Sequence, residues 1–439
     1  MPVGPWPRPR CSRPWRPTPP SGALGETPSR TERRTEPHPG FLPWRPAAPQ
    51  LQTGGLLPSI PRRLKFSFHA LARLVRAIGL LDRRPGYYGL KISLTIVAFL
   101  AGWALFVMAG DSWAALAVAP VAGVMCTQLA FLGHDAGHNQ VFGTRRRNRL
   151  LGLIVGNALI GLSFGWWVPK HSAHHAHPNE LGRDPDIGAG AALAPSAAPG
   201  NRRGPLASWL ARWQAPLFFP LMLLRSGGMH VLGIGRLVRR RDRAAAVEAC
   251  LIMLHAALYL TVVLWVLSPL RALAFVAVQQ GVFSLYLGIS FAPNHKGMPV
   301  IESGTAAGFA RRQVVTARNI RGGRFTTFVL GGLNYQIEHH LFESMPRPNL
   351  RRVQGLVRDF CAAADLGYRE ESFAGSFRQI TQHLRDAGTA SRVQAPLAPG
   401  GAARSSAAGG GDRRADGRYP RARQTASTLL PSGSRTKAP

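Results

Sequence analysis

Seven of the fourteen histidines fall in three short groups whose spacing suits metal binding. "HDAGH" supplies His134 and His138, "HSAHH" supplies His171, His174 and His175, and "QIEHH" supplies His339 and His340. On a helix, positions i, i+3 and i+4 lie on one face, so each group can direct its rings to one point. Imidazole nitrogen is a good ligand for iron, copper and zinc. The three groups therefore predict a metal site.

The elements that would position these histidines are four apolar runs. They span residues 90–110, 113–132, 249–267 and 272–292. Each is about long enough for a helix rising ~1.5 Å per residue to cross a ~30 Å hydrocarbon core. Because only short connectors separate the first run from the second and the third from the fourth, each pair predicts a helical hairpin. The fold class we expect is an all-α integral membrane protein with four transmembrane helices in two hairpins.

Basic residues surround the outer ends of both predicted hairpins and are nearly absent from the two tips. Examples are Arg145–Arg149 after the second run, Arg239–Arg241 before the third and Arg318 after the fourth. By the positive-inside rule the tips are extracytoplasmic, and the rest of the chain, both termini included, is cytoplasmic. The positive charge of these basic segments then faces anionic lipid headgroups. With no nucleic-acid-binding motif visible, we expect membrane lipid and no nucleic acid as a partner.

The two ends of the chain differ in composition from this apolar body. Residues 1–60 are rich in Pro and Arg, and residues 392–439 are rich in Gly, Ala and Arg. Such segments bury too little apolar surface to offset the entropy of ordering, so both are predicted to be disordered tails. Residues 61–391 are predicted to form the membrane domain.

In this topology the three histidine groups and His295, at the end of the fourth run, emerge on the same membrane face. Eight imidazoles are too many for one tetrahedral zinc, and they suit two metal ions held in a cytosolic helical cap. The expected ligands are His134, His138, His171, His174, His175, His295, His339 and His340.

Polar residues beside these histidines are candidates for weak ligation or for orienting the rings. They are Gln336, Asp135, Glu338, Asn294, Asp184 and Asp186. The Gln336 amide can bind a metal weakly or orient a neighbour, and the carboxylates can accept hydrogen bonds from ligand imidazoles. The alternative for Asp184 and Asp186 is a solvated loop.

Further motifs make a family resemblance specific. "GLSFGWWVPKH", "DPDIG", "SFAPNHKGMP", "ARNIRGG" and "GGLNYQIEHHLFESMPRPNL" accompany the three histidine groups. Over residues 62–390 the chain resembles the membrane fatty acid desaturases, in particular bacterial members of the front-end and linoleoyl-CoA desaturase-like branch. Many front-end relatives carry a fused cytochrome b5, which this chain lacks.

The resemblance implies a cytosolic di-iron centre in a bacterial cell membrane. With O2 as co-substrate, the centre would introduce a cis double bond into a fatty acyl chain carried by CoA or lipid. Two external electrons are then needed, and no flavin, haem or iron–sulfur motif is visible. We therefore expect a separate ferredoxin-like or flavoprotein donor that docks at the basic cytosolic face.

Three other functions fit part of this pattern. A hydroxylase or ketolase of the same superfamily would use the same histidine cage. A membrane metal transporter would need polar residues along the spans, whereas these histidines lie at span ends. A bis-histidine haem carrier would need facing histidines across a helix bundle instead of clustered groups.

Two amphipathic or apolar segments are expected to lie at the membrane without crossing it. Residues 150–168 carry no charge and are long enough to span. A crossing would place "HDAGH" and "HSAHH" on opposite sides of the bilayer, beyond the ~2 Å reach of metal–nitrogen bonds. Residues 62–84 mix basic side chains with apolar ones at helical spacing, such as Leu71 and Val75, and predict an interfacial helix.

Overall fold

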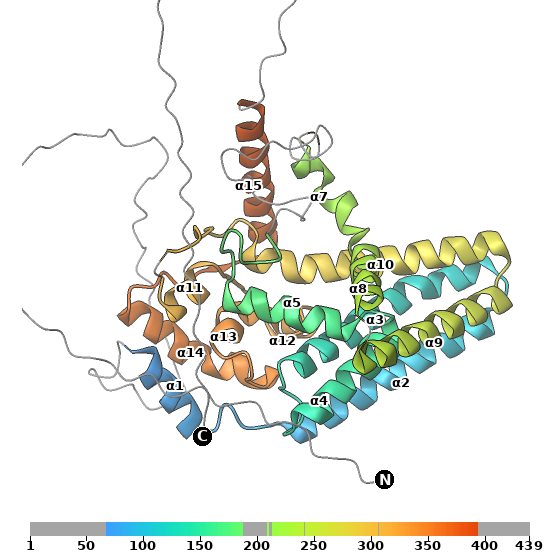
Figure 1. Cartoon of the computed structure of the whole chain (residues 1–439), viewed down its shortest axis with the longest axis horizontal. Helices are drawn as coiled ribbons and strands as arrows, with labels where there is room; N and C mark the ends of the chain where they lie inside the picture. Colours follow the sequence, from blue (N-terminus) through green and yellow to red (C-terminus); the bar gives the residue numbers. More distant parts are fainter. Residues whose placement is uncertain (1–66, 188–208, 210–212, 241, 306, 394–439) are drawn as a thin grey trace, which may run out of the picture. The chain divides into compact units, whose positions relative to one another are not determined.

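The computed structural model describes residues 67–187, 209, 213–240, 242–305 and 307–393, and this part of the chain is almost entirely helical (Figure 1). The predicted tails lie outside the described residues, except for residues 392 and 393 at the end of the last helix. Their disorder therefore stays a prediction.

Four helices are long and apolar enough to cross a membrane, as the sequence predicts. They are α2 (Pro85–Ala109), the 3-10 turn η2 (Trp113–Ala117) continuing into α3 (Val118–Gly137), α9 (Arg243–Val266) and α10 (Pro269–His295). Most of them extend beyond the predicted apolar runs at their polar ends. Two of these extensions bring His134 and His295 into the helices.

The remaining regular structure surrounds the polar ends of these helices. It comprises α1 (Phe68–Ala77), α4 (Arg145–Gly152), the π-helix η3 (Leu153–Leu159), α5 (Phe164–Ala176), α7 (Gln214–Met222), α8 (Arg225–Arg239), α11 (Phe309–Val315), α12 (Arg324–Val329), η4 (Leu333–Tyr335), α13 (Gln336–Leu341), α14 (Arg347–Ala363) and α15 (Phe373–Val393). The strands β1 (Asn319–Ile320) and β2 (Glu370–Glu371) form a parallel pair.

Helix α3 packs against both α2 and α10. Its approach to α10 depends on Gly123, because a Cβ atom there would lie 2.7 Å from the Gln279 carbonyl oxygen. Gln279 also makes the interhelical hydrogen bonds expected of a polar group within a span. Its amide oxygen accepts from Tyr259, and its amide nitrogen lies 3.2 Å from Cys126 Sγ.

The uncharged segment 150–168 is folded back on itself. The helical stretch Arg145–Leu159 and helix α5 meet at an angle of 119° across a short break, which is the geometry of a broken span or a re-entrant loop. Such a bend separates the segment into two short pieces, neither of which has the length of the four candidate spans. Both geometries fit this bend, so the statement that the segment does not cross stays a prediction.

A buried carboxylate fastens the break between η3 and α5. Glu248 of α9 accepts hydrogen bonds from Ser163 Oγ at 2.9 Å, Gly165 N at 2.9 Å and Asn157 Nδ2 at 3.3 Å. Ser163 also caps α5 by accepting from the backbone N–H of Trp166. These contacts satisfy backbone and side-chain groups that a helix break frees inside an apolar region.

The prediction of an interfacial helix at residues 62–84 is corrected in part. Helix α1 forms, but Leu71 and Val75 are buried in a cluster with Val353 and Val357 of α14. An apolar stripe that suits a lipid surface also suits packing against another helix. Here α14 of the same chain covers it.

Arg318 likewise does not face lipid headgroups. It is 1% exposed. Its guanidinium donates to the Pro293 and Lys296 carbonyls at the end of α10 and to Gln379 of α15. A cation at a helix C-terminus is stabilised by the helix dipole, so Arg318 holds the end of α10, where His295 lies.

Replacing Gly123 with Ala should destabilise the protein by about 1–3 kcal/mol, because the added methyl group forces α3 away from α10. The matched control is Gly102→Ala in α2, where an added Cβ meets nothing within 4 Å. That control should be neutral or raise the melting temperature, since Ala favours helix. Thermal unfolding in detergent measures both. Equal melting temperatures for the two variants would contradict the close packing at Gly123.

Candidate metal centre

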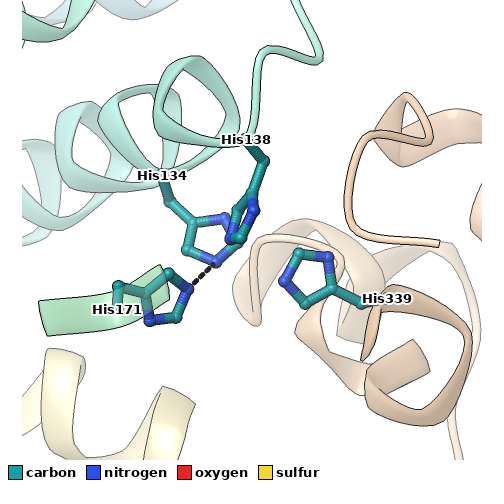
Figure 2. Close-up of side chains that lie close together, drawn as sticks. All are labelled: His134, His138, His171 and His339. Atoms are coloured by element: carbon teal, nitrogen blue, oxygen red, sulfur yellow. Dashed lines mark hydrogen bonds between the residues drawn. The ribbon is translucent and has the colours of Figure 1, made fainter. Parts of the chain in front are cut away.

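Seven of the eight predicted ligands form two groups in which one nitrogen of each ring lies within 4.8 Å of the others. The first comprises His134, His138, His171 and His339, whose rings converge from three separate segments of the chain (Figure 2). The second comprises His174, His295 and His340. The three histidine groups of the sequence are thus mixed in space, and each spatial group takes rings from three segments.

His175, the eighth predicted ligand, lies between the two groups. Its Nε2 is 3.1 Å from Nε2 of His171 in the first group. Its ring stacks on that of His340 in the second, with centroids 4.2 Å apart and an angle of 13°. In Figure 2 a dashed line joins His134 and His171, whose Nε2 atoms are 3.2 Å apart.

Unpartnered nitrogens show that the site fits a metal. Among the described residues, the Nε2 atoms of His138, His339 and His340 are buried and have no hydrogen-bond partner. Burial, together with the neighbouring histidines, lowers the pKa of His339 and His340 well below the usual value. The rings are therefore neutral at physiological pH, and neutral imidazole is the form that binds a metal.

The rings of the second group are oriented through their Nδ1 atoms. His174 donates to Asp184 Oδ2 at 2.9 Å, and His295 donates to the Thr316 carbonyl at 3.0 Å. His340 donates to Gln313 Oε1 at 2.8 Å. Such bonds fix the tautomer and direct Nε2 to the metal position. Asp184 is predictable from its place shortly after the second histidine group, whereas no sequence pattern indicates Gln313 or Thr316.

Gln313 connects two of the histidine segments. While its amide oxygen accepts from His340, its amide nitrogen donates to the His175 carbonyl at 2.9 Å. The side chain is fully buried. No spacing rule relates this glutamine to either histidine, so the sequence offers no signal for it.

Gln336 lies beside the Nε2 atom of His295, the nitrogen directed to the metal position. Its amide nitrogen lies 2.9 Å from His295 Nε2, and its oxygen accepts from Asn294 Nδ2 at 3.0 Å. Asn294, also a predicted site residue, is buried beside the second group, and its own Oδ1 is unpartnered among the described residues.

Asp135 forms a buried ion pair with Arg347 next to His134 of the first group. Its Oδ2 lies 2.7 Å from Arg347 of α14, and its Oδ1 lies 3.6 Å from His134 Nδ1. Arg347 also donates to the Phe131 carbonyl. The pair links α3 to the segment after the last histidine group, and the sequence analysis missed Arg347. Removing one partner of such a pair costs about 3–5 kcal/mol.

The other two predicted carboxylates have different surroundings. Both oxygens of Glu338 accept hydrogen bonds elsewhere, from Asn319 at 2.6 Å and from Tyr368 at 2.7 Å, so its predicted bond to a histidine is wrong. Burial raises the pKa of Glu338 to about 7. Asp186 pairs with Lys170 and is 3.7 Å from His174 Nδ1, which makes it a weaker neighbour than Asp184. The solvated-loop alternative therefore fails for Asp184, which is 1% exposed.

Trp167 stacks on His171, with ring centroids 4.4 Å apart and an angle of 21°. Its ring reaches over Gly137, where a Cβ atom would lie 2.6 Å from it. The indole thus packs directly against the first group and restricts the plane of the His171 ring.

Known proteins resemble this chain in sequence over most of its length. A model of the fatty acid desaturase family matches residues 111–372. The chain is 33% identical to the Delta(5) fatty acid desaturase fat-4 of Caenorhabditis elegans over 345 residues, which cover 76% of each chain. It is 34% identical to the Delta(8)-fatty-acid desaturase of Euglena gracilis, over 69% of this chain and 74% of that protein. It is 32% identical to the Acyl-lipid (9-3)-desaturase of Physcomitrium patens, over 70% of this chain and 60% of that protein. The chain belongs to the fatty acid desaturase family.

Replacing Asp184 with Asn should weaken metal binding about 10–100-fold, because the carboxylate that orients His174 is lost. Asp186→Asn is the matched control, since its carboxylate is farther from the same ring. Metal content is measured by mass spectrometry after competition with graded concentrations of a chelator. Equal retention of metal in the two variants would show that Asp184 does not support the site.

Proposed function

We propose that this protein is an O2-dependent fatty acyl desaturase with a di-iron centre bound by the eight histidines. The observation that carries the proposal is the meeting of these buried rings, several with unpartnered Nε2 atoms, in a chain of the desaturase family. Nitrogen ligands without bridging carboxylates separate the site from the glutamate-rich di-iron bundles.

The proposed division of labour follows from the chemistry of the substrate. An unactivated methylene has no acidic proton, so acid–base catalysis by side chains does not reach it. Bound iron would supply O2 activation and hydrogen abstraction. The chain supplies the ligands and holds their orientation through Asp184, Thr316 and Gln313. By burying the site it also excludes water.

Desaturation is favoured over hydroxylation or ketone formation because the relatives are named as desaturases. A metal transporter is disfavoured because the histidines lie at or beyond the ends of the candidate spans, as in α3 and α10.

The proposed topology has two transmembrane hairpins with the histidines and the helical cap on the cytosolic side of a bacterial cell membrane. It rests on the distribution of basic residues around the four candidate spans. A separate ferredoxin-like or flavoprotein donor would supply electrons at this face, where Arg145 and Arg147 are exposed and attract an acidic partner.

Expression in a host of known lipid composition should produce a new unsaturated acyl chain, located by gas chromatography–mass spectrometry. The purified protein should hold two irons per chain, and NADPH alone should not support turnover. His339→Ala should lose at least about a hundredfold in activity while the protein remains in the membrane, because one ligand is removed.

The control for this experiment is His69→Ala, which removes an exposed histidine of α1. It should retain iron and activity. A hydroxylated product in place of a double bond would show that the protein is a hydroxylase and not a desaturase. One tightly bound zinc, or full activity of His339→Ala, would reject the proposed centre.

Single cysteines at Thr144 and Ser172, both exposed, test the topology of the bent segment in a cysteine-free background. If α4, η3 and α5 do not cross, both sites lie on the cytosolic side. An impermeant maleimide should then label neither site in intact cells and both sites after the cells are opened. Labelling of one site from outside would show that the segment crosses the membrane.

A further inference from the structure

Helix α12 is attached to the rest of the protein in an unusual way. None of its six residues is buried, and Phe325 and Phe328 are 78% and 56% exposed. Glycines flank it on both sides, and the pair after it, Gly331 and Gly332, has positive φ angles of 61° and 84°. A short helix with no buried face and a glycine hinge can move as a unit.

Helix α12 lies beside two of the candidate membrane spans, α2 and α10. Its last carbonyl, Val329 O, accepts a hydrogen bond of 2.6 Å from Tyr286 Oη in α10. Lys91 of α2 lies 5.1 Å over the Phe328 ring and donates to Gln128 of α3. Because Gln128 precedes His134 by six residues on α3, these attachments lie about 9 Å farther into the spans than the first group of histidines.

The exposed side chains of α12 match a lipid surface. Phe325 and Phe328 suit hydrocarbon, and the exposed Arg324 suits anionic headgroups. The helices that it contacts through Lys91 and Tyr286 are candidate spans, so the neighbour expected beside α12 is the bilayer.

Beneath α12 a row of aromatic rings leads to the first group of histidines. The Phe131 ring lies 6.0 Å from that of Tyr286 and 6.5 Å from that of Phe291, and Phe291 lies 6.1 Å from the ring of His134. The C-terminal hinge of α12 covers this row, because a Cβ atom at Gly331 would lie 2.5 Å from the Phe131 ring. Moving α12 together with this hinge would therefore uncover the Phe131 ring at the outer end of the row.

We propose that α12 is a lateral lid through which the acyl chain of a membrane lipid enters from the bilayer and follows Phe131 and Phe291 to His134. The inference rests on the proposed function and specifies its substrate as a lipid-borne acyl chain. The side-chain contacts that hold the lid shut are the Tyr286–Val329 hydrogen bond, the Lys91–Phe328 contact and a 3.2 Å hydrogen bond from Asn334 Nδ2 to Thr327 Oγ1.

Photolabelling tests the route without requiring turnover. The full chain is reconstituted in vesicles of phosphatidylcholine that carries a diazirine in one acyl chain, and adducts are mapped by mass spectrometry. We expect adducts on Phe131 and Phe291. Tyr286→Phe, which keeps the ring and removes the donor to Val329, should raise the Phe131 adduct about fivefold, since a hydrogen bond that holds the lid closed is lost.

The internal control is Val121 of α3, which is 49% exposed. Its labelling should be the same in the wild type and in Tyr286→Phe. Adducts confined to outward-facing residues such as Val121 in both proteins would overturn the lid. Labelling of Phe131 by an aqueous diazirine acyl-CoA and not by the lipid would overturn lateral entry.

If the protein desaturates acyl chains but Phe131 stays unlabelled, only this inference fails. If Phe131 is labelled but no double bond forms, only the proposed function fails.

Discussion

Buried imidazole rings whose Nε2 atoms have no hydrogen-bond partner place the strongest constraint on this structure. Within the described chain, the Nε2 atoms of His138, His339 and His340 face other rings instead of hydrogen-bond donors. Unpartnered polar atoms in a buried site cost free energy, and lone pairs that face one another add repulsion. A bound cation would convert this cost into attraction. Hydrogen bonds from Asp184, Thr316 and Gln313 hold rings of the site in place against this cost.

That support comes from residues outside the histidine segments. Gln313 bonds both His340 and the backbone at His175, so one side chain sets the distance between two of the segments. Arg347 reaches Asp135 beside His134 and ties the last histidine segment to α3. Arg318 holds the end of α10, and its backbone N–H donates to the Asn294 carbonyl. The fold thus contributes cross-connections between segments, and the histidine segments contribute the nitrogens.

Helix α5 carries the second histidine segment. To bring α5 back to the other histidines, the chain must reverse direction after η3, next to apolar helices. A reversal there frees backbone groups that lipid cannot satisfy. Glu248 accepts from Ser163 and Gly165, His255 lies 3.2 Å from the Ala158 carbonyl, and His230 lies 3.0 Å from the Gly161 carbonyl. The hydrogen bonds of these residues in the described part of the chain go to the bent segment, at Asn157, Ala158, Gly161, Ser163 and Gly165. Their role is to make the bend stable, and the bend places α5.

The sequence by itself determined the four candidate spans and the eight histidines, because apolar length and i, i+3, i+4 spacing are properties of single helices. The tertiary structure decided which rings meet, and it mixed the three sequence groups into two spatial ones. It also decided that Arg318 and the apolar face of α1 are buried against protein, although their sequence suits a membrane surface equally well. Gln313 and Arg347 could not be predicted for the same reason. Their contacts join residues distant in the chain, and neither composition nor helical periodicity carries information about such pairs.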